Sequence, residues 1–161
     1  MTRRARRIRD QAIPYNRGPA ILCDVCVLVA AARPDHVHHQ LARDAIASTL
    51  TTAMPFAVCS LLLAGFLRVG THRKIFPQPL ALDEALALVD RYRVHPNAVR
   101  VDPGEGHWAI FTQLLVVTGL TGGAISDAWH AALAIEHGCE WWTFDRDFAR
   151  FPGLRWRNLL G

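Results

Sequence analysis

The most constraining feature of this chain is an apolar run that contains a single carboxylate. Residues 21–29 read ILCDVCVLV, with Asp24 in fourth place. The length of the run and its β-branched content predict a buried strand of the parallel type, which is apolar along its whole length. A carboxylate in such surroundings is costly unless it is paired or binds a cation. The run therefore predicts a sheet interior and a candidate functional residue together.

The rest of the chain alternates between helical and extended patterns. Helices are predicted from Pro34 onward, with an apolar stripe of Val37, Leu41, Ala45 and Leu50, and over 60–69, 80–92, 106–118 and 127–137. Ser126 is expected to cap the last of these helices, and Gly138 is expected to end it. Short strands are predicted at 98–101, 140–144 and 154–156. Alternation of this kind indicates an α/β fold around a mostly parallel sheet.

Composition and charge describe one folded domain preceded by a basic arm. Of all residues, 51% are apolar and 20% are charged, which is typical of a globular protein. The net charge of +4 is unevenly distributed, because residues 1–20 carry six arginines against one aspartate and residues 21–161 have a net charge of −1. We therefore predict a disordered arm over 1–20, and a domain over 21–161 whose charge is nearly balanced.

Several features bear on the compartment. The four cysteines lie in apolar surroundings and do not have the density of a disulfide scaffold, which favours a reducing cytoplasm. A basic N-terminus followed by an apolar run is similar to a signal peptide, but the basic part is too long and Asp24 interrupts the run. No stretch reaches the ~18 uninterrupted apolar residues of a membrane span. We expect a cytoplasmic protein without a membrane partner.

Four aspartates occupy positions at which parallel sheets carry their sites. Asp24 belongs to the first apolar run, Asp127 begins a helix, and Asp145 and Asp147 directly follow a predicted strand. Loops and helix N-termini converge at the carboxyl ends of parallel strands, so we expect Asp24, Asp127 and Asp145 to converge there. Several carboxylates without an arginine in the same strands indicate a hard divalent cation, Mg²⁺ or Mn²⁺, and such a cation usually handles phosphates. The structural alternative is that Asp127 caps its helix and that Asp145 and Asp147 form an Asx turn.

Two other groups of metal-ligating residues give weaker signals. Cys23 and Cys26 have the spacing of a redox or zinc pair, but residues three apart on a strand point to opposite faces, so buried inert thiols are favoured. His36, His38 and His39 lie near a helix start without the spacing of a known metal motif, and solvated histidines are expected.

Together, four segments resemble the PIN-domain ribonucleases, specifically the VapC-type toxins of bacterial toxin–antitoxin pairs. The segments are ILCDVCVLVAA, LLLAGFLRVGTHRKIF, SDAWHAALAIEHG and WWTFDRDFARFPGLRW. The resemblance covers about residues 21–160, and its most specific part is the T-x-D-x-D-F pattern at 143–148. It implies a three-layer α/β/α fold with a mostly parallel central sheet, an acidic cluster that holds Mg²⁺ or Mn²⁺, cleavage of RNA, homodimers, and inhibition by a cognate antitoxin protein.

The resemblance also implies roles for individual residues. Asp24, Asp127 and Asp145 match the first, third and fourth acidic residues of the family site, and Asp147 matches a nearby acid that often completes it. Thr143 matches a small hydroxyl residue beside them. At two positions the chain departs from the family pattern: Cys26 stands where asparagine is common, and Ser60 stands where the second acidic residue is expected.

These observations lead to one main prediction and two alternatives. The main prediction is a metal-dependent RNA endonuclease that acts as the toxin of a toxin–antitoxin pair. The first alternative is a PIN-fold module that binds an antitoxin or RNA without efficient cleavage, because Ser60 removes one charge from the metal site. The second is a Mg²⁺-dependent phosphatase that uses Asp145 and Asp147, which is disfavoured because the chain lacks a D-x-D-x-T run after its first strand.

Overall fold

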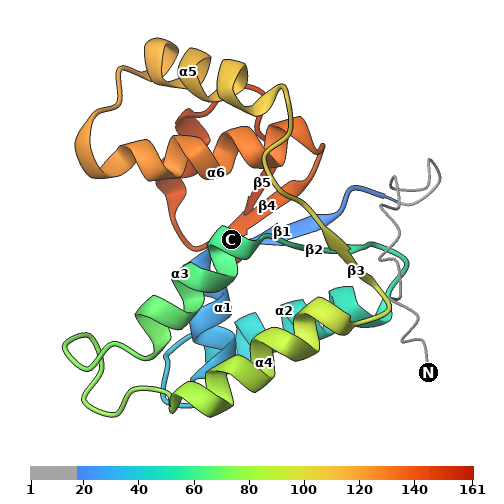
Figure 1. The fold of residues 1–161 in the computed structure, drawn as a ribbon, viewed down its shortest axis with the longest axis vertical. Helices are drawn as coiled ribbons and strands as arrows, with labels where there is room; N and C mark the ends of the chain where they lie inside the picture. Colours follow the sequence, from blue (N-terminus) through green and yellow to red (C-terminus); the bar gives the residue numbers. More distant parts are fainter. Residues whose placement is uncertain (1–17) are drawn as a thin grey trace, which may run out of the picture.

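The computed structural model describes residues 18–161, which form a parallel sheet between two layers of helices (Figure 1). The sheet has the strand order β3-β2-β1-β4-β5, and every neighbouring pair is parallel. Its strands are β1 (Ile21–Cys23), β2 (Phe56–Val58), β3 (Ala98–Arg100), β4 (Glu140–Thr143) and β5 (Trp156–Asn158). The predicted α/β/α architecture is therefore confirmed.

Six α-helices cover the two faces of this sheet. They are α1 (Val25–Ala32), α2 (His39–Thr51), α3 (Ser60–Gly70), α4 (Leu82–Val94), α5 (His107–Thr118) and α6 (Ile125–Glu136), all within the described residues. Helices α1, α2 and α4 lie on one face and α5 and α6 on the other, as the two ends of the molecule in Figure 1 show. Two 3₁₀ helices, η1 (Gly122–Ala124) and η2 (Arg146–Arg150), precede α6 and follow β4.

The first apolar run is not one strand, contrary to the prediction. Strand β1 ends at Cys23, and α1 begins at Val25, with Asp24 as its N-cap residue. Both elements are buried, since Ile21 and Leu22 lie in the centre of the sheet and Val27 to Ala30 pack beneath it. A run that is buried on all sides is apolar in either conformation, so its hydrophobicity does not mark the point at which strand becomes helix.

Two further details of the helices differ from expectation. Ser126 is not the cap of α6, because this helix begins one residue earlier, at Ile125, and the Ser126 hydroxyl donates back to the carbonyl of Gly123. The predicted stripe on α2 is right only in part. Val37 precedes the helix and is 85% exposed, and Leu41 is exposed as well, whereas Ala45 and Leu50 pack against the core as partly buried residues.

The fully buried residues of α2 are Ala42, Ile46 and Thr49. The predicted positions Leu41 and Ala45 are thus one residue away from the centre of the buried face.

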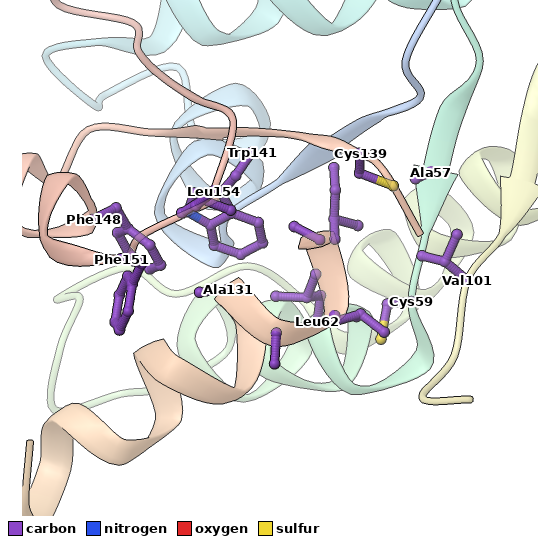
Figure 2. Close-up of a cluster of buried hydrophobic side chains, with 14 of the residues drawn as sticks. Ala57, Cys59, Leu62, Val101, Ala131, Cys139, Trp141, Phe148, Phe151 and Leu154 are labelled. Atoms are coloured by element: carbon purple, nitrogen blue, oxygen red, sulfur yellow. The ribbon is translucent and has the colours of Figure 1, made fainter. Parts of the chain in front are cut away.

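The core is divided by the sheet into two clusters. Beneath α5 and α6, Trp141 of β4 is fully buried and packs with Phe148, Phe151 and Leu154 from the segment after β4 (Figure 2). On the other face, side chains of β1 and β2 pack against α1, α2, α3 and α4. The first cluster fixes the segment after β4, which carries Asp145 and Asp147, firmly against the sheet.

Helix α3 approaches α1 unusually closely at one glycine. A Cβ atom at Gly65 would lie 2.9 Å from Cγ2 of Val25, a distance that real Cβ atoms essentially never show. The hydrogen atom of glycine thus lets α3 pack directly against the first turn of α1. This contact brings the start of α3 close to the helix that follows Asp24.

The predicted basic arm, residues 1–20, lies almost wholly outside the described residues. Of its last three residues, Ala20 is buried at the start of β1. Across residues 18–161, none of the helices is both long and apolar enough to cross a bilayer.

Candidate functional site

The sheet topology marks one place at which a site can form. The chain runs outward from β1 through β2 to β3 and then returns across the sheet to β4, on the other side of β1. Helices that leave neighbouring strands in opposite directions open a crevice at the carboxyl ends of those strands, and α/β proteins bind ligands there. In this chain the direction of the connections changes between β1 and β4. Asp24 directly follows β1, and Asp145 lies two residues after β4.

Asp24 is held at this point by its backbone. Its N–H donates to the carbonyl of Trp142 at 2.9 Å, which continues the ladder between β1 and β4. Its own carbonyl accepts from the N–H groups of Val27 and Leu28, which begins α1. The half-buried side chain is directed toward β4, where Oδ2 accepts a hydrogen bond of 2.7 Å from the hydroxyl of Thr143.

Thr143 connects the two strands through one hydroxyl group. This residue is fully buried at the end of β4, and its Oγ1 donates to Asp24 and accepts from the N–H of Asp145 at 3.0 Å. The Sγ atom of Cys26 lies 3.8 Å from the same oxygen. A single hydroxyl therefore aligns Asp24, whose position is fixed by β1, with the segment that follows β4.

Asp145 and Asp147 form a tight turn after β4. Oδ1 of Asp145 accepts from the N–H of Asp147 at 2.8 Å, so Asp145 is the N-cap of η2. The structural interpretation of these two residues as an Asx-type turn is therefore confirmed. It leaves the other carboxylate oxygen of Asp145 without a hydrogen bond to the described residues, and the Asp147 side chain is exposed.

Asp127 joins the cluster from the first turn of α6. Burial is the largest cause that raises the pKa of its carboxyl group. The negative charges of Asp145, Asp24 and Asp147 raise this pKa further, and the positive charge of Arg150 lowers it. The Arg150 guanidinium contacts both Asp127 and Asp147, and hydrogen bonds join Asp24 through Thr143 to Asp145. The four aspartates predicted from the sequence thus lie at the carboxyl edge of the sheet.

Arg150 is a member of this cluster that the sequence analysis missed. Its Nη2 atom lies 3.1 Å from Oδ2 of Asp147 and 3.9 Å from Oδ2 of Asp127. The signal that could have found it is the spacing of three residues between Asp147 and Arg150, which places oppositely charged side chains on the same side of a helical turn.

Ser60 and Cys26 lie at this edge, but neither contributes a charge. Ser60 is exposed at the first position of α3, which directly follows β2, the neighbour of β1. Cys26 lies in the first turn of α1, where burial and the charge of Asp24 raise the pKa of its thiol to about 12. The thiol is consequently protonated and neutral at pH 7.

The donor set fits a hard divalent cation in its chemistry, although it does not form a closed cage. Within residues 18–161, no three His, Cys, Asp or Glu side chains are close enough together, as they stand, to hold a metal ion between them. The cluster is open to solvent, however, and Mg²⁺ is typically bound by one or two carboxylates while it keeps several waters. Burial raises the pKa of Asp127 most, and the charges of the other three aspartates add to this effect. A divalent cation relieves such an accumulation of negative charge.

The three histidines predicted to be solvated do not form a site of their own. His38 packs its ring against Phe144 at 5.1 Å between centroids, and Nδ1 of His39 is 2.9 Å from the carbonyl of Ala30. Cys23 is buried in the core, and burial raises the pKa of its thiol. These residues support the turn between α1 and α2 and the core beneath it.

Comparison with known proteins identifies close relatives. A family model described as the PIN domain matches residues 21–154. Ribonuclease VapC43 of Mycobacterium tuberculosis is 40% identical to this chain over 141 residues, which are 87% of this chain and 96% of the relative. Ribonuclease VapC25 of the same organism is 38% identical over 134 residues, which are 83% of this chain and 94% of the relative.

Solved structures show the same fold at low identity. VapBC2 from Rickettsia felis, solved bound to a DNA fragment from its promoter, superimposes with a TM-score of 0.63 at 18% identity and covers 86% of this chain and 97% of its own. VapC20 of M. tuberculosis, a toxin that cleaves the sarcin–ricin loop, superimposes with a TM-score of 0.61 at 16% identity, over 84% of this chain and 99% of its own.

Proposed function

Because this chain belongs to the PIN domain family, we propose that it is a metal-dependent endoribonuclease and the toxin of a toxin–antitoxin pair. Relatives of 40% and 38% identity are named VapC ribonucleases and are matched over nearly their whole length. The observation that carries the proposal is the hydrogen-bonded connection from Asp24 through Thr143 to Asp145 at the switch point of the sheet. The connection joins carboxylates that are more than a hundred positions apart in the sequence.

Asp24, Asp127 and Asp145 would hold Mg²⁺ or Mn²⁺, with Asp147 beside them. A cation bound there lowers the pKa of a water molecule and stabilises charge on phosphoryl oxygens. Thr143 fixes the carboxylate of Asp24 by donating to Oδ2, which leaves Oδ1 as the oxygen for a ligand. Asp145 is oriented in the same way, because Oδ1 is occupied by the N–H of Asp147.

The alternative of a weakened binding module receives no support from the relatives, which are named ribonucleases. The phosphatase alternative likewise has no support from the family. In our proposal the side chains of Ser60 and Cys26 carry no charge, so the negative charge of the site comes from the four aspartates alone.

The direct test is RNA cleavage by the purified protein with Mn²⁺ or Mg²⁺ and with EDTA. We expect cleavage only with the cation, and we expect Asp24→Asn to abolish it. Asp90→Asn is the matched control, since Asp90 is an exposed aspartate on α4 and its substitution should leave cleavage unchanged. Cleavage that persists in EDTA or in the Asp24→Asn protein would contradict the proposal.

An antitoxin protein is the expected partner. Similar folds have been solved as VapBC complexes from R. felis and Salmonella typhimurium. We propose that the product of a neighbouring reading frame binds this chain and relieves the growth arrest that its induction causes. We place this assembly in the cytoplasm, because the four cysteines are free thiols and a reducing compartment keeps thiols in that state.

We further propose that the protein is a homodimer that buries the outer side of α5. This helix is the outermost element of its layer (Figure 1), and it exposes Trp108 by 65%, Val116 by 83% and Val117 by 62%. Large apolar side chains that one helix leaves exposed are typical of an interface. Light scattering is expected to give a dimer, and Val116→Asp is expected to give a monomer that retains the wild-type circular dichroism spectrum.

A further inference from the structure

Arg150 brings a positive charge into the acidic cluster. Its guanidinium contacts Asp147 at 3.1 Å and Asp127 at 3.9 Å, two residues that come from different elements. The ion pairs of both aspartates within the described residues are made with this one arginine. The site therefore already has a counter-charge of its own.

Two contacts hold the guanidinium group of Arg150 but leave its Nη2 atom adjustable. Nε donates to the carbonyl of Asp147 at 2.7 Å, and Cζ lies 5.6 Å from the ring centre of the buried Phe151. The contact between Nη2 and Asp127 is less constrained, because the side chains of Arg150 and Asp127 are 30% and 31% exposed and the separation of 3.9 Å is that of a charge contact without a hydrogen bond. An ion pair with this exposure is weak enough for a divalent cation to replace it.

We propose that Arg150 is the built-in counter-cation of the site and that it competes with the divalent metal for Asp127 and Asp147. The inference rests on the proposed metal-dependent function. Without metal, Arg150 offsets the repulsion between carboxylates that burial and fold force together. When metal binds, the guanidinium gives up both carboxylates, so the affinity for metal is lower than the aspartates alone would provide.

The test compares two substitutions that each replace an arginine of η2 by an uncharged residue. Arg150→Gln removes the ion pairs, whereas Arg146→Gln removes an equal charge from an exposed arginine at the start of η2. Calorimetric titration with Mn²⁺ alone is expected to show roughly fivefold to tenfold tighter binding by Arg150→Gln, and less than about twofold tighter binding by Arg146→Gln. Arg150→Met, which removes the charge and keeps an unbranched apolar side chain, serves as the second variant if the glutamine variant does not fold.

Thermal unfolding provides a second readout that does not depend on activity. In EDTA, Arg150→Gln is expected to lower the Tm by roughly 2–4 °C relative to Arg146→Gln, since the carboxylates lose their counter-charge. Saturating Mn²⁺ is expected to remove that difference, because the cation then takes over the role of the guanidinium.

The outcomes separate this inference from the proposed function. Mn²⁺ binding by both Arg150 variants that equals or falls below that of the wild-type protein overturns the inference, and so does equal tightening in Arg146→Gln. Tighter Mn²⁺ binding without RNA cleavage by any form upholds the inference and contradicts the proposed function. If neither the wild-type protein nor the Arg150 variants bind Mn²⁺, both are overturned.

Discussion

At the scale of single residues, the site depends on one buried hydroxyl group more than on any single carboxylate. Thr143 is the only link that the described residues provide between the Asp24 side chain and the backbone of Asp145, through bonds of 2.7 and 3.0 Å. A buried polar group that loses its partner costs more than the bond itself contributed. The hydroxyl is thus important for both stability and the orientation of the acids.

Replacing Thr143 by valine should separate these two contributions. Valine has the same shape but leaves Oδ2 of Asp24 and the N–H of Asp145 without their partner, so we expect a loss of about 1–3 kcal/mol in the free energy of unfolding. Urea denaturation of Thr143→Val measures this loss. Thr143→Ser, which restores the hydroxyl and removes only a methyl group, should recover most of it; equal losses in both variants would show that packing, and not hydrogen bonding, is responsible.

Ser60→Glu is expected to strengthen metal binding. Ser60 is exposed at the N-terminus of α3, where a negative charge is favourable for the helix, so the substitution should not cost stability. The added carboxylate should improve Mn²⁺ affinity by about tenfold, or 1–2 kcal/mol after desolvation, in a calorimetric titration.

Ser48→Glu is the control for this experiment. Ser48 is exposed on α2, close to the residues that contact Asn97 at the opposite edge of the sheet. The same charge placed there should leave Mn²⁺ affinity unchanged. Equal or weaker binding by Ser60→Glu would mean that Ser60 is not beside the metal.

The aspartates of the site were predictable from the sequence, but their counter-charge was not. Asp24 is conspicuous because a carboxylate in an apolar run is costly unless it is paired or binds a cation. Asp145 and Asp147 are conspicuous because they follow a strand. Arg150 has no such contrast with its surroundings, since arginine is frequent in this chain. Its importance comes from a contact with Asp127, 23 positions away in the chain, which only the folded structure brings about.

At the scale of elements, prediction succeeded where a particular residue type marks the end of a helix or strand. Gly138, with a φ of 63°, ends the region of α6 as predicted, because glycine adopts this conformation without strain. The boundary between β1 and α1 has no such marker. The N–H of Asp24 makes the last bond of the ladder, to Trp142, whereas its carbonyl already accepts from the first turn of α1. The position of the boundary therefore depends on a partner strand more than a hundred residues away.

Gly65→Ala tests the close packing of α3 on α1. Alanine favours the helical conformation by about 1 kcal/mol, but its Cβ would lie 2.9 Å from a methyl group of Val25, which has little rotational freedom. We expect a net destabilisation of about 1–3 kcal/mol in urea denaturation.

Two further variants isolate the cause of this loss. Val25→Ala should relieve the clash, so the double variant Gly65→Ala/Val25→Ala should lose less than the two single variants together. Gly123→Ala is the control, because an added Cβ there meets nothing within 4 Å among the described residues. Additive losses in the double variant would show that the two helices do not press on each other at this point.

At the scale of the whole molecule, stability is expected to depend on pH through a histidine beneath the site. His130 of α6 stacks on Trp141 at 5.6 Å, and burial, followed by the smaller opposing effect of Asp24, sets the pKa of its imidazole below the ordinary value of 6.5. The unfolded chain therefore takes up a proton near pH 6.5 that the folded chain does not bind. The free energy of unfolding should be highest above pH 6.5 and fall as the pH is lowered toward the folded-state pKa.

His130→Phe should remove this part of the pH dependence. The slope attributable to one proton is at most about 1.4 kcal/mol per pH unit, and urea denaturation between pH 7.5 and 5, at roughly half-unit steps, measures it. His72→Phe, in the loop after α3, leaves the contact between α6 and β4 intact and should retain the wild-type slope. An unchanged slope in His130→Phe would assign the effect to another group.

The hydrogen bond between Asp24 and Thr143 spans 119 positions of the chain, and this separation has a consequence for protein synthesis. Strand β1 is made before its neighbour β4 and the acids that follow it, which are added more than a hundred residues later. A chain whose synthesis stops before β4 has Asp24 without Thr143, Asp145 or Asp147. The cell that translates this message is therefore exposed to a complete site only after β4 and the segment that follows it have been made.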